Sequence, residues 1–296
     1  MGNTKENKNK ERVRFGPSGN DVLFWQQGYK SSVQSPEWLA KFGLDAFEIN
    51  FGRGLRMTDK TAKEIGDEAK KHDIKISAHA PYFINLATND PVKLSKSYGY
   101  IKRSLELLQI MGGRHLVIHI GSQGELERSK AIEYCKQNLK SIIKRLNEEE
   151  GFFSFDYRLC IETMGRFKPI GTYQEVCDIC TIDKRVVPAV DFGHINCTTF
   201  GELSRNENAI AEVMDYCTEK LGKAKMQDLH IHFSAIKYGD KGELSHTTLD
   251  DPKFAIPFKP LADYIKKHNL TPTIICESRD IMAQDALKLK REFDLV

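Results

Sequence analysis

Several short apolar runs of this 296-residue chain end in a histidine, an aspartate or a glutamate, the side chains that bind divalent metals and move protons. An ionisable group is costly to bury at such a place unless it has a partner. If the ends of these runs converge, their imidazoles and carboxylates form a ligand set that suits zinc or manganese, and the number of imidazoles favours zinc. The six residues are His79, His119, Glu162, Asp191, His232 and Glu277.

Each candidate ligand also has an ordinary structural explanation. A lone histidine at a strand end is usually held by a hydrogen bond, and Asp191 can cap the turn that follows it. His115 and His230 keep the structural interpretation, because both lie at the beginnings of apolar runs. His72 and His268 fall near expected helix C-termini, where they complement the helix dipole. Six apolar runs all end in a histidine, an aspartate or a glutamate, and this coincidence nevertheless favours one shared metal site.

The elements that must position these residues alternate along the chain. Eight short apolar runs are expected to be strands, with segments of helical composition between them. Alternating strands and helices indicate a parallel sheet, and eight such units close into a (β/α)8 barrel, whose active site lies at the carboxyl ends of the strands. The strand runs are 13–15, 46–49, 74–78, 115–120, 157–162, 186–191, 229–234 and 273–277. The clearest helical segments are 60–71, 93–111, 128–148, 203–221 and 258–268.

The fold class is therefore predicted to be α/β, as a single (β/α)8 TIM barrel. An open doubly wound sheet is the alternative, but no glycine-rich phosphate-binding motif follows the first strand. The chain has no internal repeat and no linker rich in proline, glycine or serine. We expect one barrel domain over residues 12–296, preceded by a flexible polar tail over residues 1–11.

Composition narrows the class of protein. Hydrophobic residues make up 40% and charged residues 29% of the chain, which excludes a disordered chain and a fibre. No apolar run approaches about 18 residues, so we expect no membrane span. The net charge of +3 forces no nucleic-acid partner, and DNA binding would need a local basic patch. The seven cysteines follow no disulfide framework, and Cys177 and Cys180 fall in a helical pattern. We therefore expect reduced thiols and a cytoplasmic protein.

Six segments around the candidate ligands resemble motifs of the endonuclease IV family, a group of zinc-dependent apurinic/apyrimidinic endonucleases in the xylose isomerase-like barrel superfamily. The segments occur in the family's order and span nearly one whole barrel. Ile120 stands where the family has proline, and the Ala-Gly-Gln-Gly that usually follows the family's glutamate is absent after Glu162. The six segments are 77–86, 117–122, 160–163, 191–194, 232–237 and 275–278.

The resemblance implies a centre of three zinc ions with Glu162 bridging the first two. The first ion would be bound by His79 and His119, the second by Asp191, His232 and Glu277, and the third by His194 and His246.

The third zinc site departs from the family pattern. The family carries Asp-Arg-His where this chain has Leu244-Ser245-His246, so an aspartate ligand and a DNA-contacting arginine are missing. Glu243 and Asp240 are close enough in sequence to replace the aspartate. Two or three zinc ions are therefore expected, with manganese as an alternative metal.

The resemblance further implies hydrolysis of the phosphodiester 5′ to an abasic site in double-stranded DNA, as in base excision repair. Glu162, as the bridge, and Glu277, which would position the nucleophile, are the expected catalytic residues. Tyr82 and Asn85 would contact the DNA by the same resemblance. The loop containing Arg53 and Arg56 could bind phosphates, although a solvated loop has the same sequence pattern.

Two other functions fit parts of the pattern. Sugar isomerases and epimerases of the same superfamily use glutamate, aspartate, histidine and glutamate around one divalent ion, a set that Glu162, Asp191, His232 and Glu277 would also supply. The additional histidines favour the multinuclear centre over that alternative. A non-catalytic protein that binds damaged DNA is a second alternative, and it would have no need of both glutamates. In either DNA-binding case we expect a monomer.

Overall fold

The computed structural model describes residues 11–52, 54–149, 152 and 154–296 of the chain. Residues 1–10 of the expected tail and the predicted DNA contact Arg53 lie outside the described residues. The predicted boundary between tail and barrel therefore stays a prediction.

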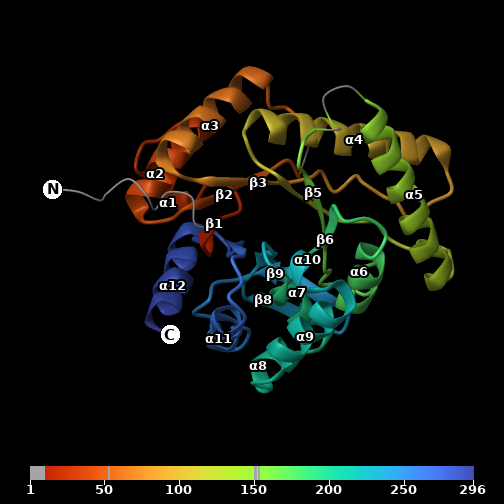
Figure 1. The fold of residues 1–296 in the computed structure, drawn as a ribbon. Coiled ribbons are helices and arrows are strands. Elements are labelled where there is room, and N and C mark those ends of the chain that lie inside the picture. The colour runs from red at the N-terminus through yellow and green to blue at the C-terminus, as the bar shows by residue number, and fades with distance from the viewer. Residues whose placement is uncertain (1–10, 53, 150–151, 153) are drawn as a thin grey trace.

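Eight parallel strands form one sheet that curls into a nearly closed barrel, with helices around it (Figure 1). The strands are β1 (Arg14–Pro17), β2 (Ala46–Asn50), β3 (Lys75–His79), β4 (His115–Ile118), β5 (Arg158–Glu162), β6 (Val186–Asp191), β7 (His230–His232) and β10 (Thr273–Cys276). Their order across the sheet is β1-β10-β7-β6-β5-β4-β3-β2. The structure thus confirms the predicted (β/α)8 barrel, and the alternative of an open doubly wound sheet is wrong.

The barrel closes at a seam between β1 and β2, the two strands at the ends of this order. At the seam, Ser18 forms a parallel bridge with Glu48, and the N–H of Gly19 donates to the carbonyl of Glu48 at 2.9 Å. Deeper in the seam, the N–H of Asp45 donates to the carbonyl of Phe15 at 3.1 Å. Few backbone bonds join these two strands, in contrast to the regular ladders between the others.

The helices begin where the sequence supplies N-cap side chains. Thr58 caps the helix that starts at Asp59, and Asp90 caps the one that starts at Pro91. Thr172 forms a capping box with Glu175. The helices are α1 (Val22–Gln26), α2 (Ser35–Phe42), α3 (Asp59–His72), α4 (Pro91–Ile110), α5 (Arg128–Glu148), α6 (Tyr173–Cys180), α7 (Phe192–Thr198), α8 (Glu202–Arg205), α9 (Ala209–Leu221), α10 (Lys223–Met226), α11 (Lys259–His268) and α12 (Met282–Leu295), with a 3-10 turn η1 (Ser32–Gln34).

The helix predicted over 203–221 is wrong as a single element, because the chain breaks between α8 and α9. Asn206 ends α8 in an extended conformation, and its side chain accepts a hydrogen bond from the N–H of Asn208 at 3.0 Å. An asparagine side chain that bonds to nearby backbone competes with the helix in this way. Helix α12, which has no counterpart among the predicted helices, lies beside β1 and places the ring of Phe293 5.7 Å from that of Phe15.

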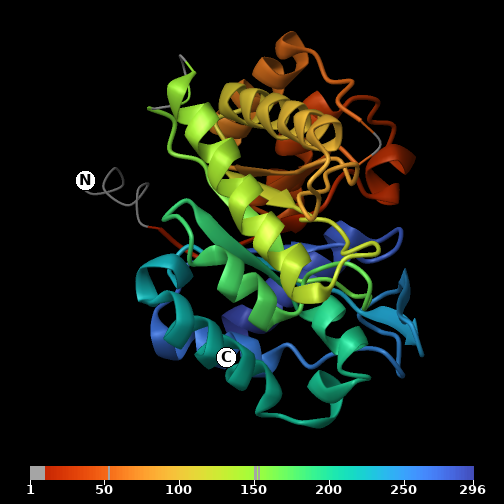
Figure 2. The ribbon, with the colours of Figure 1, turned by 90° about the vertical axis from the view of Figure 1, so that its right-hand side faces the viewer.

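A small antiparallel ribbon follows β7 and was not predicted. Its strands are β8 (Ile236–Gly239) and β9 (Gly242–His246), with a register shift between Lys237 and Tyr238. Figure 2 shows the ribbon standing at one edge of the barrel, apart from the eight-stranded sheet. The ribbon carries two of the residues considered as ligands of the third metal.

The main apolar core joins side chains of the strands to those of the surrounding helices. A second, much smaller apolar cluster consists of Val117, Cys160, Val187 and Ala189. Cys177 and Cys180 are buried on α6, as the helical pattern predicted. None of the helices within the described residues is both long and apolar enough to cross a membrane.

Candidate metal centre

The six predicted ligands lie at or just beyond the carboxyl ends of the strands. Four of them occupy the last positions of β3, β5, β6 and β7, and two follow directly after β4 and β10. Within the described residues all six belong to two groups whose ligand atoms lie within 4.8 Å of one another, and other residues form a third group of the same kind. The groups are His79, His119 and Glu162 (the first cluster), Glu162, Asp191, His232 and Glu277 (the second cluster), and His194, Glu243 and His246 (the third cluster).

In the first cluster, two imidazoles face one oxygen of Glu162. Glu162 Oε2 lies 3.0 Å from His79 Nε2 and 2.7 Å from His119 Nε2. The other ring nitrogen of His79 is 2.9 Å from the carbonyl of Ala80, an acceptor that requires a proton on Nδ1. Burial lowers the pKa of His79, but the hydrogen bond and charge of Glu162 outweigh burial and raise it to about 9. This histidine is therefore oriented with Nε2 towards the cluster.

Glu162 connects the first cluster to the second. Its other oxygen, Oε1, lies 3.2 Å from His232 Nδ1 and 3.4 Å from His194 Nδ1. Burial alone would raise the pKa of Glu162, but the surrounding imidazoles, His119 foremost, hold it well below its ordinary value. A carboxylate that offers one oxygen to each side has the arrangement expected of the predicted bridge.

The second cluster contains a buried oxygen that has no hydrogen-bond partner. Asp191 is fully buried, and its Oδ1 accepts a hydrogen bond from the N–H of His194 at 2.8 Å, whereas Oδ2 accepts none. That Oδ2 lies 3.1 Å from His194 Nδ1, whose proton is donated to the carbonyl of Thr163, and 3.8 Å from His232 Nδ1, while Glu277 Oε2 lies 3.5 Å from the latter nitrogen. Burial raises the pKa of Asp191 to about 6, against the attraction of the neighbouring imidazoles. An orphaned carboxylate oxygen among three other oxygen and nitrogen ligands fits a divalent metal such as zinc.

The third cluster forms although the family's aspartate is missing. Glu243 Oε2 lies 3.5 Å from His194 Nε2, and Glu243 Oε1 lies 3.9 Å from His246 Nε2. The hydrogen bond to His194 lowers the pKa of Glu243 to about 2, so the side chain is a carboxylate at neutral pH. Asp240, the other sequence candidate, is exposed at the turn of the ribbon and is not part of this cluster. Of the two sequence candidates, Glu243 is therefore the one that lies beside His194 and His246.

Two glycines allow the ribbon to bring Glu243 to His194. The N–H of Glu243 donates to the carbonyl of Gly165 at 2.7 Å, so the ribbon lies directly against the loop after β5. A Cβ at Gly165 would lie 2.5 Å from His194 Cδ2 and 2.9 Å from Glu243 Cβ, closer than side chains tolerate. Gly242 has a φ of +88°, and a Cβ there would meet the carbonyl of Gly165 at 2.2 Å. The third cluster therefore depends on close backbone packing outside the barrel.

The predicted DNA contacts are spread over the rim of the same face. Tyr82 and its neighbour Phe83 are both more than half exposed, and Arg56 is exposed on the loop after β2. Asn85 is half-buried, and its Oδ1 accepts a hydrogen bond from the N–H of Ala87 at 3.0 Å, which gives it a structural role. One groove is lined by Tyr82, Phe83, Asn85 and His119, so it leads from the exposed aromatic rings to the first cluster.

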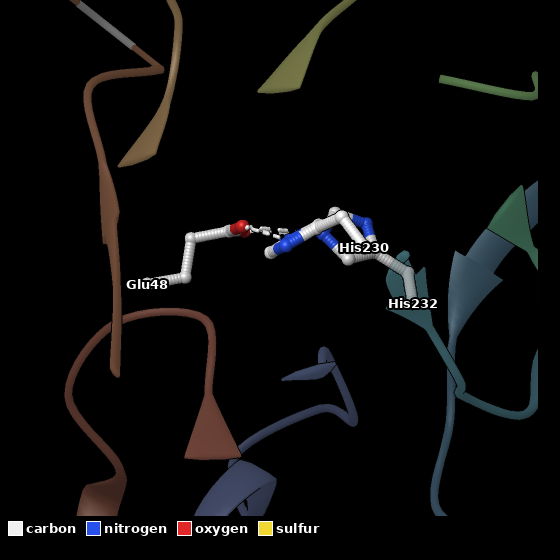
Figure 3. A group of neighbouring side chains, drawn as sticks. All are labelled: Glu48, His230 and His232. Atoms are coloured by element: carbon white, nitrogen blue, oxygen red, sulfur yellow. Dashed lines mark hydrogen bonds and ion pairs between the residues drawn. The ribbon is translucent and has the colours of Figure 1, made fainter. Parts of the chain in front are cut away.

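Sequence reasoning missed Glu48 and treated His230 as a structural residue at a strand beginning. Both are fully buried in the barrel interior, where Glu48 of β2 faces His230 and His232 of β7 (Figure 3). Burial would raise the pKa of Glu48, but the two imidazoles hold it well below its ordinary value. The signal was available in part, because residues 230 and 232 share one face of a strand. The position of Glu48 inside an apolar run gave no sign of which way it points.

Comparisons with known proteins agree with this architecture. A family model described as a xylose isomerase-like TIM barrel matches residues 36–293. An uncharacterized protein of Methanocaldococcus jannaschii is 31% identical over 255 residues, covering 86% of this chain and 88% of that protein. The probable endonuclease 4 of Mycoplasma pneumoniae is 27% identical over 168 residues, which is 55% of this chain and 54% of that protein.

Solved structures of the same fold include proteins of two different activities. The D-tagatose 3-epimerase-like protein has a TM-score of 0.69 at 20% identity over 96% of both chains. Endonuclease IV from Thermus thermophilus has a TM-score of 0.67 at 16% identity, over 95% of this chain and 98% of that one. At such identities the likeness shows a shared fold. With the family model matching most of its length and endonuclease 4 proteins among its relatives, the chain belongs to the xylose isomerase-like TIM barrel family.

Proposed function

We propose that this protein is a zinc-dependent apurinic/apyrimidinic endonuclease that cleaves the phosphodiester 5′ to an abasic site in double-stranded DNA. The observation that carries the proposal is the third cluster, in which Glu243 supplies the carboxylate that the motif lacks. A site for a single metal would need only the second cluster. The relatives named endonuclease 4 support the same assignment.

The three clusters are close enough to act as one centre. Glu162 serves both of the first two clusters, and the third is joined to them through the contact between His194 and Glu162. Divalent metals, when bound there, supply Lewis acidity and lower the pKa of a water molecule towards about 7. The imidazole-rich donor set favours zinc, as two or three ions, over manganese.

Protein side chains would orient the attacking water, accept its proton and hold the clusters in place. Glu277 is the most exposed carboxylate of the second cluster, with 16% of its side chain accessible, so it can orient the attacking water and accept its proton. Glu162 is almost completely buried and is placed to hold the first two clusters at a fixed separation. These roles agree with the two catalytic glutamates that the sequence predicts.

Binding of an anionic substrate is supported by cations at the rim. Arg166 is exposed beside the third cluster, and its Nε donates to the carbonyl of Glu243 at 3.1 Å. The rest of its guanidinium can contact a phosphate, which is the role expected of the arginine that is missing next to His246.

The exposed rings of Tyr82 and Phe83 could fill the gap that an extruded abasic sugar leaves in the duplex. The seven cysteines are all free thiols, which fits an intracellular enzyme.

A sugar epimerase or isomerase is the second candidate, and one observation favours it. The second cluster alone offers two glutamates, an aspartate and a histidine around one position, which is a complete set for a single divalent ion. The structural likeness to a D-tagatose 3-epimerase-like protein also favours a single-metal epimerase site at this cluster. A sugar epimerase or isomerase with a single metal would leave the third cluster without a function.

The proposal is tested with zinc-loaded protein and a duplex that carries one tetrahydrofuran abasic analogue. This analogue resists β-elimination, so a lyase cannot produce the expected cut. We expect a nick immediately 5′ to the analogue with a 3′-hydroxyl, lost in Glu162→Gln and Glu277→Gln and retained in Glu133→Gln, an exposed glutamate on α5. Binding of this duplex without a nick would instead indicate the non-catalytic alternative. Intact, unbound DNA would overturn the proposal, and conversion of ketoses in the presence of manganese would then support the epimerase.

A further inference from the structure

A fully buried carboxylate lies behind the second cluster, inside the barrel. Glu48 Oε2 is 2.8 Å from His230 Nε2, and Glu48 Oε1 is 3.2 Å from His232 Nε2. Figure 3 shows the Glu48 side chain reaching from β2 towards both imidazoles of β7. His232 therefore lies between two sets of carboxylates, with Nε2 towards Glu48 and Nδ1 towards Glu162 and Glu277.

The surroundings of Glu48 determine where the proton of His232 lies. Besides the two imidazoles, the hydroxyl of Ser18 donates to Glu48 Oε1 at 3.0 Å, and that of Ser77 lies 3.4 Å from Oε2. An ionised carboxylate only accepts hydrogen bonds, and these four donors use its acceptor capacity. Each Nε2 must then carry a proton, so the lone pair of neutral His232 is on Nδ1, the nitrogen that faces the second cluster.

The other two buried histidine ligands each donate a hydrogen bond to a backbone carbonyl. His79 Nδ1 donates to the carbonyl of Ala80, and His194 Nδ1 donates to the carbonyl of Thr163, both at 2.9 Å. His194 Nδ1 also lies 3.1 Å from Asp191 Oδ2, a carboxylate of the second cluster, whereas the carboxylate behind His232 belongs to none of the three clusters. A carboxylate hydrogen-bonded to the far nitrogen of a histidine fixes its tautomer and makes it a stronger metal ligand.

We infer that Glu48 is a positioning residue for the second cluster, which holds His232 with Nδ1 free for a divalent metal and strengthens its binding there. The inference rests on the proposed metal centre but is independent of the reaction that the centre catalyses. Glu48, His230 and His232 could also be regarded as a fourth metal site. Their nitrogen–oxygen distances and the two serine donors instead fit a carboxylate that is already saturated by hydrogen bonds.

The test compares zinc binding by the full-length protein and by Glu48→Gln, in competition with a chelator of known affinity. Asp191→Asn identifies the ion held by the second cluster, because Asp191 belongs to that cluster alone. We expect Glu48→Gln to weaken this one ion about 10- to 100-fold and to leave the others unchanged. Glu133→Gln is the matched control on the surface.

A second variant and a spectroscopic readout keep the test decisive if Glu48→Gln fails to fold. Replacing both partners, in Glu48→Leu with His230→Leu, removes the carboxylate without leaving an unpaired buried charge. Its expected effect on the ion of the second cluster is the same. Nitrogen-15 NMR of the zinc-loaded protein should find the proton of His232 on Nε2 in the wild type, with the Nε2 signal shifted in the variants that lack the carboxylate.

Three results would overturn the inference. In the first, a folded variant binds every ion as tightly as the wild type does. In the second, the wild type binds one ion more than the three clusters account for, and Glu48→Gln loses only that ion, as a fourth metal site requires. In the third, the wild type binds no metal, and the metal centre fails as well. Metal binding as expected with no nicking of abasic DNA would overturn the proposed endonuclease alone.

Discussion

His194 Nε2 lies 3.5 Å from Glu243 Oε2, although His194 lies in the first turn of α7 and Glu243 lies on the separate ribbon β8–β9. The contact places a carboxylate with two imidazoles where the related motif would use an aspartate. Because a glutamate is longer by one methylene, it reaches the site from a position one residue earlier in the chain. The third cluster therefore contains a carboxylate although the motif's aspartate is missing.

Replacement of Glu243 by glutamine should remove the third metal. An amide oxygen is a weaker zinc ligand than a carboxylate, so the variant should bind one zinc ion fewer while keeping the first two clusters. Nicking of the abasic duplex should fall by about 100-fold or more if a charge-stabilising group is lost. Metal content by mass spectrometry and single-turnover nicking rates measure both effects.

Glu243→Asp is the informative control for that substitution. It keeps the negative charge but shortens the reach, so the zinc affinity should lie between those of the wild type and of Glu243→Gln. Equal zinc content and equal nicking in all three proteins would show that Glu243 is not a ligand.

Substitution of Gly165 by alanine should disturb the third cluster without replacing any of its ligands. The added Cβ would lie 2.5 Å from His194 Cδ2, so the imidazole or the ribbon must move. Overpacking of this kind costs about 1–3 kcal/mol of stability. We expect a weaker third metal together with a lower unfolding midpoint in urea. Gly99→Ala on α4, where an added Cβ meets no atom within 4 Å, is the matched control and should leave the third metal unchanged without lowering the unfolding midpoint.

The pH dependence of stability should carry a contribution from His115, which lies at the opposite end of the barrel from the clusters. Burial lowers the pKa of His115 to about 4, despite the carboxylate of Asp228 3.3 Å away. Because the unfolded chain takes up this proton near pH 6.5 and the folded protein only near pH 4, this contribution is complete above pH 6.5. It is lost as the pH falls through about 4, and it amounts to at most about 3 kcal/mol.

His115→Gln tests this contribution. Unfolding in urea between pH 7 and 4.5 should show a smaller fall in the free energy of unfolding for the variant than for the wild type. Titrating groups that do not contact His115 are common to both proteins and cancel in the comparison, whereas Asp228, whose pKa His115 helps to lower, does not. Parallel curves for the two proteins would contradict the prediction, and His72→Gln on α3 serves as the control.

Tyr82→Ala should weaken binding of abasic DNA while leaving the metals in place. An aromatic ring that stacks in a duplex gap contributes about 1–3 kcal/mol, which corresponds to roughly 5- to 150-fold in Kd. Fluorescence anisotropy with abasic and intact duplexes measures the loss, which should be confined to the abasic one. Tyr134→Ala on α5 is the control, and an unchanged Kd for Tyr82→Ala would argue against a role in lesion recognition.

The sequence predicted the barrel and the residues of the first two clusters because both follow from local pattern. In a parallel barrel every strand delivers its last residue to the same end, so a polar residue after an apolar run has a known destination. His79, Glu162 and Asp191 each stand at such a place. No knowledge of distant contacts was needed to bring them together.

The residues that local pattern did not place depend on packing between distant segments. Glu243 could be named as a substitute ligand, but the choice between it and Asp240 depends on how the ribbon docks against Gly165. The role of Glu48 was hidden because a barrel strand is buried on both faces, so an apolar run does not reveal which side chains point inward. Asn206 broke a helix through a side-chain hydrogen bond that composition does not predict.

The seam between β1 and β2 couples separation of these two strands to the position of a metal ligand at the carboxyl ends of the strands. Glu48 receives the bridging amide of Gly19 through its backbone and holds His232 through its side chain. A fluctuation that separates these strands must also withdraw the carboxylate from behind a metal ligand. An ion in the second cluster should therefore slow hydrogen exchange at the Gly19 amide, so that this single backbone proton reports on the occupancy of a site to which it is not directly bonded.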